Sequence, residues 1–141
     1  MHTAQGIVED VGGINFSGDA QTKESLIRVM RDKCVRQFDI NGESYPVTTI
    51  SMFATELSHL LGPNSGHMID FLTTIYTKDK RYAALTKNKG DDVLERPFVN
   101  LIACTTQQWI TTYLKSDIIG GGFTRRVIFV NEPTSSSVDD K

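Results

Sequence analysis

The chain has 141 residues, which is enough for one domain with a sizeable buried core. Its hydrophobic content of 39%, charged content of 23% and formal net charge of −2 are ordinary for a globular protein and exclude a strongly basic nucleic-acid-binding arm, but not a local basic patch. Nothing approaches the roughly 20 apolar residues of a membrane span, and the N-terminus lacks a signal-peptide pattern. We therefore expect a cytoplasmic protein without a membrane partner.

The first 33 residues predict one short strand and one helix. Residues 1–13 are polar and glycine-containing, and we expect a flexible stub there. Residues 14–17 alternate between apolar and polar, as a short strand does. Thr22 is placed to cap a helix whose apolar stripe faces the core, and the members of that stripe are Leu26, Ile27, Val29 and Met30.

A hairpin follows. Residues 35–40 alternate with period two, Asn41-Gly42 is a strong two-residue turn signal, and residues 45–53 resume the strand pattern. Pro46 indicates an edge or a bend at the start of the second strand. That strand leads to a single acid, Glu56, after which a helical turn is predicted over residues 56–61.

The second half of the chain predicts a helix, a projecting hairpin and two further strands. The helix carries apolar residues from Met68 to Tyr76, and residues 77–96 form the hairpin, with Lys87 and Lys89 near its tip. The nearly continuous apolar run 98–104 is typical of a strand covered on both faces. A helix capped by Thr105 or Thr106 follows, then a last strand at 127–130. We expect residues 133–141 to be a disordered tail.

These elements predict an α/β fold over residues 14–132. Strands that alternate with helices indicate a mostly parallel sheet flanked by helices, with an antiparallel β-hairpin insertion. Both cysteines, Cys34 and Cys104, lie in apolar surroundings and are expected to be buried and reduced. The histidines and cysteines lack the spacing of a metal site, so no metal site is predicted.

Glu56 and Thr105 are the first candidates for chemistry. A nucleotide hydrolase on an α/β sheet places an acid at the carboxyl end of a buried strand, where it orients a water molecule. Glu56 fits that position, but a helix dipole alone also favours an acid there. Thr105 ends the next strand, where its hydroxyl is placed to hold a water or a γ-phosphate; the alternative is a simple helix cap.

Basic residues supply the other candidates. Arg125 and Arg126 follow a glycine-rich loop, from which an arginine reaches the phosphate of a neighbouring subunit, and the alternative is a solvated or ion-paired surface. Lys87, Lys89 and Arg81 belong to the projecting hairpin. They are candidates for contacts to a nucleic-acid backbone, although acidic neighbours partly cancel their charge and a solvated hairpin remains open.

Five segments in this order resemble the phage- and mobile-element-encoded primase–helicase ATPases, which have a RecA/AAA+-like core. The segments are INFSGDAQTKESLIRVM, ISMFATELSHLL, IDFLTTIYTKDKRYAALT, FVNLIACTTQQWI and GGGFTRRVIFV. The resemblance implies that Glu56 is the Walker B glutamate, that Thr105 is the polar sensor, and that Arg125 or Arg126 reads a neighbour's nucleotide. It also implies that the Lys87–Lys89 hairpin contacts DNA or another subunit.

The sequence departs from this family at two points. Thr55 stands where many such ATPases have a magnesium-associated aspartate, and the chain holds no G-x-x-x-x-G-K-[S/T] phosphate loop. We therefore expect part of a replicative helicase or primase–helicase ATPase core that acts on DNA as a homo-oligomer. ATP and magnesium belong to the intact parent protein, and this chain alone is expected to be inactive. The alternatives are a non-catalytic ATPase-like binding or oligomerisation module, and a small DNA-binding domain that uses the hairpin.

Overall fold

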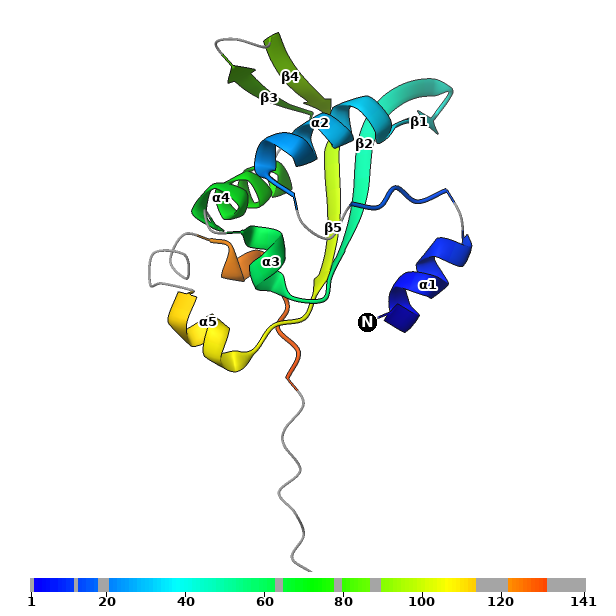
Figure 1. Cartoon of the computed structure of the whole chain (residues 1–141). Helices are drawn as coiled ribbons and strands as arrows, with labels where there is room; N and C mark the ends of the chain where they lie inside the picture. The colour runs from blue at the N-terminus through cyan, green and yellow to red at the C-terminus, as the bar shows by residue number, and fades with distance from the viewer. Residues whose placement is uncertain are drawn as a thin grey trace, which may run out of the picture.

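The centre of the fold is a three-stranded mixed sheet of order β1–β2–β5, accompanied by a separate two-stranded sheet, β3–β4 (Figure 1). The computed structural model describes residues 2–11, 13–17, 21–62, 65–77, 80–86, 90–113 and 122–131. In chain order the elements are α1 (His2–Val11), α2 (Lys23–Lys33), β1 (Val35–Ile40), β2 (Glu43–Ala54), α3 (Leu57–Leu61), α4 (Ser65–Tyr76), β3 (Arg81–Thr86), β4 (Gly90–Glu95), β5 (Pro97–Ala103), α5 (Gln107–Tyr113) and η1 (Thr124–Arg126).

The first two strands form the predicted hairpin. Ile40 pairs with Glu43, which leaves Asn41 and Gly42 as a two-residue turn. Both turn residues have positive φ, 54° and 84°, as the twist of a tight hairpin requires, and this explains the choice of Asn-Gly. Pro46 pairs with Gln37 on one side, and β5 begins to pair only at Thr48, so Pro46 occupies an edge position as predicted.

The strand β2 pairs with β5 in parallel, from Thr48 beside Pro97 to Ala54 beside Ala103. The expected strand at 14–17 is reduced to a single parallel bridge between Phe16 and Ser51. The sheet is therefore mixed, with one antiparallel and one parallel strand pair, and the expectation of a mostly parallel sheet needs this correction.

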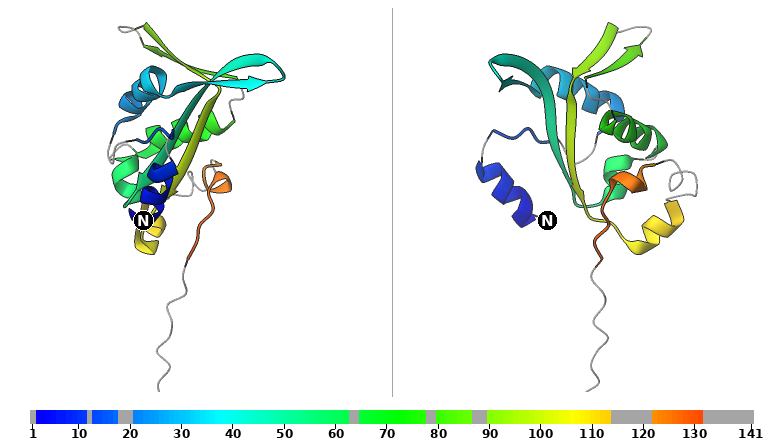
Figure 2. Two further views of the ribbon diagram at one scale, coloured as in Figure 1. Left: turned by 90° about the vertical axis from the view of Figure 1, so that its right-hand side faces the viewer. Right: turned by 180° about the vertical axis from the view of Figure 1, so that it is seen from behind.

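The core lies between one face of this sheet and the helices α2, α3 and α4. Figures 1 and 2 show these three helices packed together beside β2 and β5, whereas α1 lies apart from them, beyond the β2 edge. The helix cap and the stripe predicted for α2 are confirmed, since the Thr22 hydroxyl accepts from the Ser25 N–H at 3.2 Å and three stripe residues are buried. Fully buried core residues include Leu26, Met30, Ile50, Met52, Leu60 and Leu94.

In the described part of the chain, helices cover the strand β5 on one face only. Burial alternates along it, and Phe98 and Ile102 are 58% and 51% exposed. The prediction that this run is covered on both faces was wrong, because the helices of the described residues pack on the Val99 and Leu101 side. A continuous apolar run indicates a strand, but it does not say how many of its faces are packed.

Four further expectations need correction. Residues 2–11 form the helix α1, which was not predicted, and residues 127–130 are not a strand. Arg125 and Arg126 belong to a short 3-10 helix, η1, instead of beginning a strand. Cys104 is exposed, whereas Cys34 is buried as expected, and burial raises the pKa of the Cys34 thiol. Among the described helices, none has the length and apolar character that a membrane crossing needs.

Candidate functional site at the carboxyl end of the sheet

The parallel register of β2 and β5 places two predicted site residues at one edge of the sheet. Ala54 pairs with Ala103, and Glu56 and Thr105 each follow two residues later. Two backbone hydrogen bonds extend the pairing past the strand ends: Cys104 N–H donates to Ala54 O at 3.0 Å, and Leu57 N–H donates to Cys104 O at 2.7 Å. The peptides next to Glu56 and Thr105 are therefore fastened to each other.

Glu56 occupies the N-cap position of α3 in an extended conformation, with φ −143° and ψ 119°. Its carbonyl oxygen accepts from the N–H of His59 at 3.1 Å, which begins the helix. Its side chain makes no capping hydrogen bond and is half-buried. The carboxylate is thus not used to close the helix terminus, which is the structural role that competes with a chemical one.

Thr105 and Thr106 have separate roles. The Thr106 hydroxyl accepts from the Trp109 N–H at 3.2 Å and caps α5, so the prediction of a capping threonine is confirmed at Thr106. The Thr105 hydroxyl oxygen is buried and has no hydrogen-bond partner among the residues that the structure describes. Burying an unpaired hydroxyl costs about 1–3 kcal/mol, so this oxygen is a place where a water or a ligand would be favoured.

Thr55 precedes Glu56 in the bend between β2 and α3, and it is exposed. Together the three side chains offer one carboxylate and two hydroxyls. Such oxygens suit an ordered water or the water shell of a magnesium ion better than direct coordination, since a metal site in proteins needs more carboxylate or carbonyl ligands. Within the described part of the chain, no three acidic, histidine or cysteine side chains gather as metal ligands do.

The two predicted arginines lie in η1. Arg126 donates from Nη1 to the carbonyl oxygen of Gly122 at 2.6 Å, and its guanidinium lies 5.2 Å from the centre of the Tyr76 ring. Arg125 is exposed. Among the described residues, no contact joins either arginine to Glu56 or Thr105, so the structure places the backbone of Glu56 and Thr105 at one sheet edge without the guanidinium groups.

The projecting hairpin is confirmed as β3–β4, paired antiparallel from Arg81–Glu95 to Thr86–Gly90. Arg81 is exposed and lies 3.8 Å from Glu95 in an ion pair, which neutralises part of its charge. Lys87 and Lys89 lie outside the described residues. The position of the hairpin on the fold is therefore known, whereas the lysines expected to contact DNA are not described.

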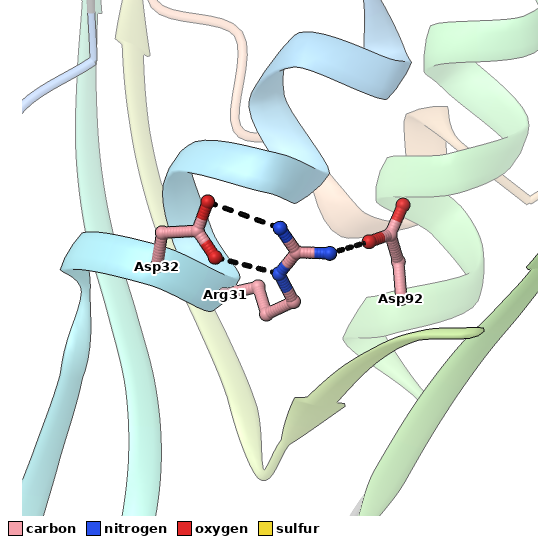
Figure 3. Close-up of polar contacts among 3 residues, drawn as sticks. All are labelled: Arg31, Asp32 and Asp92. Carbon is pink, nitrogen blue, oxygen red and sulfur yellow. Dashed lines mark hydrogen bonds and ion pairs between the residues drawn. The ribbon is translucent and has the colours of Figure 1, made fainter. Parts of the chain in front are cut away.

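An ionic contact that the sequence did not reveal holds this hairpin against α2. Arg31 donates to both carboxylate oxygens of Asp32, at 2.6 and 3.0 Å, and a third N–H donates to Asp92 on β4 (Figure 3). The hydrogen bonds that Asp32 accepts from Arg31 lower the pKa of the Asp32 carboxyl group below the ordinary value of 3.8. Alternating charges on a helix gave no signal for this partner, which lies 61 residues away.

A second anchor at the base of the hairpin is Arg96, whose φ of 42° is in the left-handed region. Its N–H donates to Lys80 O at 2.8 Å, and its guanidinium lies 4.8 Å from the centre of the Tyr45 ring.

A hollow of about 190 Å³ elsewhere on the surface lies between α2, α4 and β3, and it contains none of the predicted site residues. Its lining residues are Lys23, His67, Asp70, Phe71, Thr74 and Tyr82.

Comparisons of the chain with protein-family models, with curated proteins and with solved structures give no match. The geometry of the described residues is therefore the basis for a functional assignment.

Proposed function

We propose that the chain contributes the water-orienting and phosphate-sensing side of a nucleotide-hydrolysing core that acts on DNA, as in the phage-type helicase and primase–helicase ATPases that its sequence resembles. One observation carries the proposal: the parallel pairing of Ala54 with Ala103 leaves Glu56 and Thr105 at the same edge of the sheet. Ligands of open α/β sheets bind outside the carboxyl ends of the strands, where these two residues lie.

Each side chain has a distinct part in the proposed reaction. Glu56, free of a capping bond, accepts a hydrogen bond from the attacking water and orients it. The unpaired Thr105 hydroxyl donates to the terminal phosphate, and Thr55 holds a water of the metal's hydration shell. ATP supplies the phosphoryl group and magnesium neutralises its charge when both are bound.

The two arginines are proposed to act between subunits and not within this chain. Arg126 is engaged with Tyr76 and Gly122, which fixes η1, whereas Arg125 is exposed. An exposed arginine beside a rigid anchor is suited to reach the nucleotide of a neighbouring subunit in a homo-oligomer. This favours Arg125 over Arg126 as the residue that acts between subunits.

The test of this proposal is ATP binding, because the chain has no phosphate loop of its own. We expect no micromolar binding of ATP to this chain by titration calorimetry. We expect a G-x-x-x-x-G-K-[S/T] loop upstream in the complete reading frame, and DNA-stimulated ATP hydrolysis by the protein it encodes. A reading frame that begins at Met1, together with the absence of hydrolysis, would contradict the enzymatic proposal.

That outcome would favour the second candidate, a non-catalytic binding or oligomerisation module on an ATPase-like scaffold. The observation that supports this candidate is the uncovered face of β5, where Phe98 and Ile102 are more than half exposed. Such a face is typical of a surface that packs against another polypeptide.

A third candidate, DNA binding by the β3–β4 hairpin, has its own test. Loss of two phosphate contacts in a Lys87→Ala/Lys89→Ala variant would lower the affinity for duplex DNA and reduce the salt dependence by about two counterions. Arg81→Ala, which removes a charge already paired with Glu95, is the matched comparison and is expected to have a smaller effect. Equal binding by all three proteins would exclude the hairpin as the DNA contact.

A further inference from the structure

Among the residues that the structure describes, the outer edge of β5 has no strand beside it. Both backbone groups of Cys104 point toward β2, since its N–H donates to Ala54 O and its carbonyl accepts from Leu57 N–H. Strand residues alternate in direction, so the N–H and C=O groups of Val99, Leu101 and Ala103 point to the opposite edge. In the described part of the chain β2 is the only strand beside β5. An open edge of this kind is a template for another strand.

The segment that follows η1 has the complementary properties. Residues 127–130, with the sequence VIFV, are uncharged and β-branched or aromatic. Val127 is extended, with φ −122° and ψ 135°. Ile128 and Val130 are 89% and 92% exposed, and within the described residues no backbone partner is found for residues 128–131. Strand-forming residues rarely lie so exposed unless another surface covers them.

The two features match in period and in chemistry. In an added strand, Ile128 and Val130 would share one face and Phe129 would take the other. On β5, Phe98 and Ile102 are exposed on one face, whereas Val99 and Leu101 pack toward the core. We propose that residues 127–130 of one copy of this protein pair as an added strand with the open edge of β5 in a second copy, so that two copies exchange this segment.

In its own chain the segment does not pair with β5, since β2 is the strand beside β5 among the described residues. Phe123 is buried, Arg126 lies over Tyr76, and Val127 packs partly against the core, so the beginning of the segment is fixed. From η1 the chain then runs beyond the carboxyl ends of β2 and β5 (Figures 1 and 2). In a dimer, the segment of each copy would pair with the β5 edge of the other copy, so both segments and both edges would be paired. The inference does not depend on nucleotide hydrolysis.

Sedimentation equilibrium of the full chain tests the exchange. We expect a dimer. We expect Ile128→Asp/Val130→Asp to raise the dissociation constant of this dimer by at least about tenfold, since two charges would enter the added strand. The matched control is Ile7→Asp/Val11→Asp, which makes the same changes at two exposed residues of α1 and should leave the dimer intact. A wild-type monomer, or a dimer that both double variants affect equally, would overturn the proposal.

A peptide provides a second test that does not depend on how the variants fold. A synthetic peptide of residues 126–131 should bind to the Ile128→Asp/Val130→Asp chain, whose β5 edge is free, and should dissociate the wild-type dimer. The same peptide carrying the two aspartates is the control. Absence of binding by the unmodified peptide, or equal binding by both peptides, would overturn the proposal.

Discussion

The backbone N–H of Leu57 donates to the carbonyl oxygen of Cys104 at 2.7 Å, so the turn after β2 is fastened to the turn after β5. This bond holds two segments that are 47 residues apart in the sequence at one edge of the sheet. Glu56 precedes the donor and Thr105 follows the acceptor. The relative position of the acid and the hydroxyl is therefore set by main-chain bonds, which substitutions of either side chain leave in place.

Replacement by valine should change the free energy of unfolding differently at the neighbouring residues Thr105 and Thr106. Thr105→Val removes a buried hydroxyl without a described partner, so we expect the free energy of unfolding to stay the same or to rise by up to about 1 kcal/mol. Thr106→Val removes the cap of α5 and should lower it by about 1 kcal/mol. Urea unfolding measures both changes. A clear loss of stability in Thr105→Val would mean that its hydroxyl has a partner in the folded protein.

The Arg31 contact should control the local stability of the projecting hairpin. Arg31→Ala removes the bonds to Asp32 and Asp92, so we expect faster amide hydrogen exchange in β4, measured by mass spectrometry on peptides covering residues 90–95. Arg28→Ala changes an exposed arginine of the same helix and is the control.

The same contact sets a pH dependence. Because the pKa of Asp32 is lowered in the folded protein, its contribution to stability is present above the unfolded value and is lost as the pH falls through the folded one. As far as this carboxyl group contributes, the free energy of unfolding should thus be constant from about pH 7 to pH 5 and should decline below the ordinary value of 3.8, by more in the wild type than in Arg31→Ala. Equal exchange in Arg31→Ala and wild type at neutral pH would exclude the contact as the anchor.

The backbone of Arg96 offers a test of strain at the base of the hairpin. Its φ of 42° suits glycine and disfavours alanine, while both replacements remove the contact with Tyr45. We therefore expect Arg96→Ala to be less stable than Arg96→Gly by about 1 kcal/mol in thermal or urea unfolding. Equal stability of the two variants would show that residue 96 relaxes out of the left-handed region.

Local signals in the sequence were sufficient for the two hairpins and for the start of α2. Asn41-Gly42 specifies a turn with two positive φ angles, and Thr22 specifies a cap, because each depends on a few neighbouring residues. The alternation of strands with helices also predicted parallel pairing, and the strands β2 and β5 that precede Glu56 and Thr105 pair in this way.

The predictions that were wrong or missing depend on tertiary contacts, and local sequence patterns carry no information about these. The run at 98–104 is apolar throughout, yet only its Val99 and Leu101 side meets helices of the described residues. The run at 127–130 has strand-forming residues but no strand beside it, and a strand requires a partner for its hydrogen bonds. Arg31 donates a hydrogen bond to Asp92 on β4, and no periodicity within α2 indicates a residue so distant in the sequence.

The most direct test of the account is ATP turnover by the protein of the complete reading frame carrying Glu56→Gln, with Glu24→Gln, a change at an exposed glutamate of α2, as the control. We predict that Glu56→Gln lowers kcat by about 100-fold or more and leaves ATP binding intact, because the amide no longer accepts the water's proton. Glu24→Gln should hydrolyse ATP at the wild-type rate. Wild-type turnover in Glu56→Gln would contradict the proposed role of the edge shared by β2 and β5.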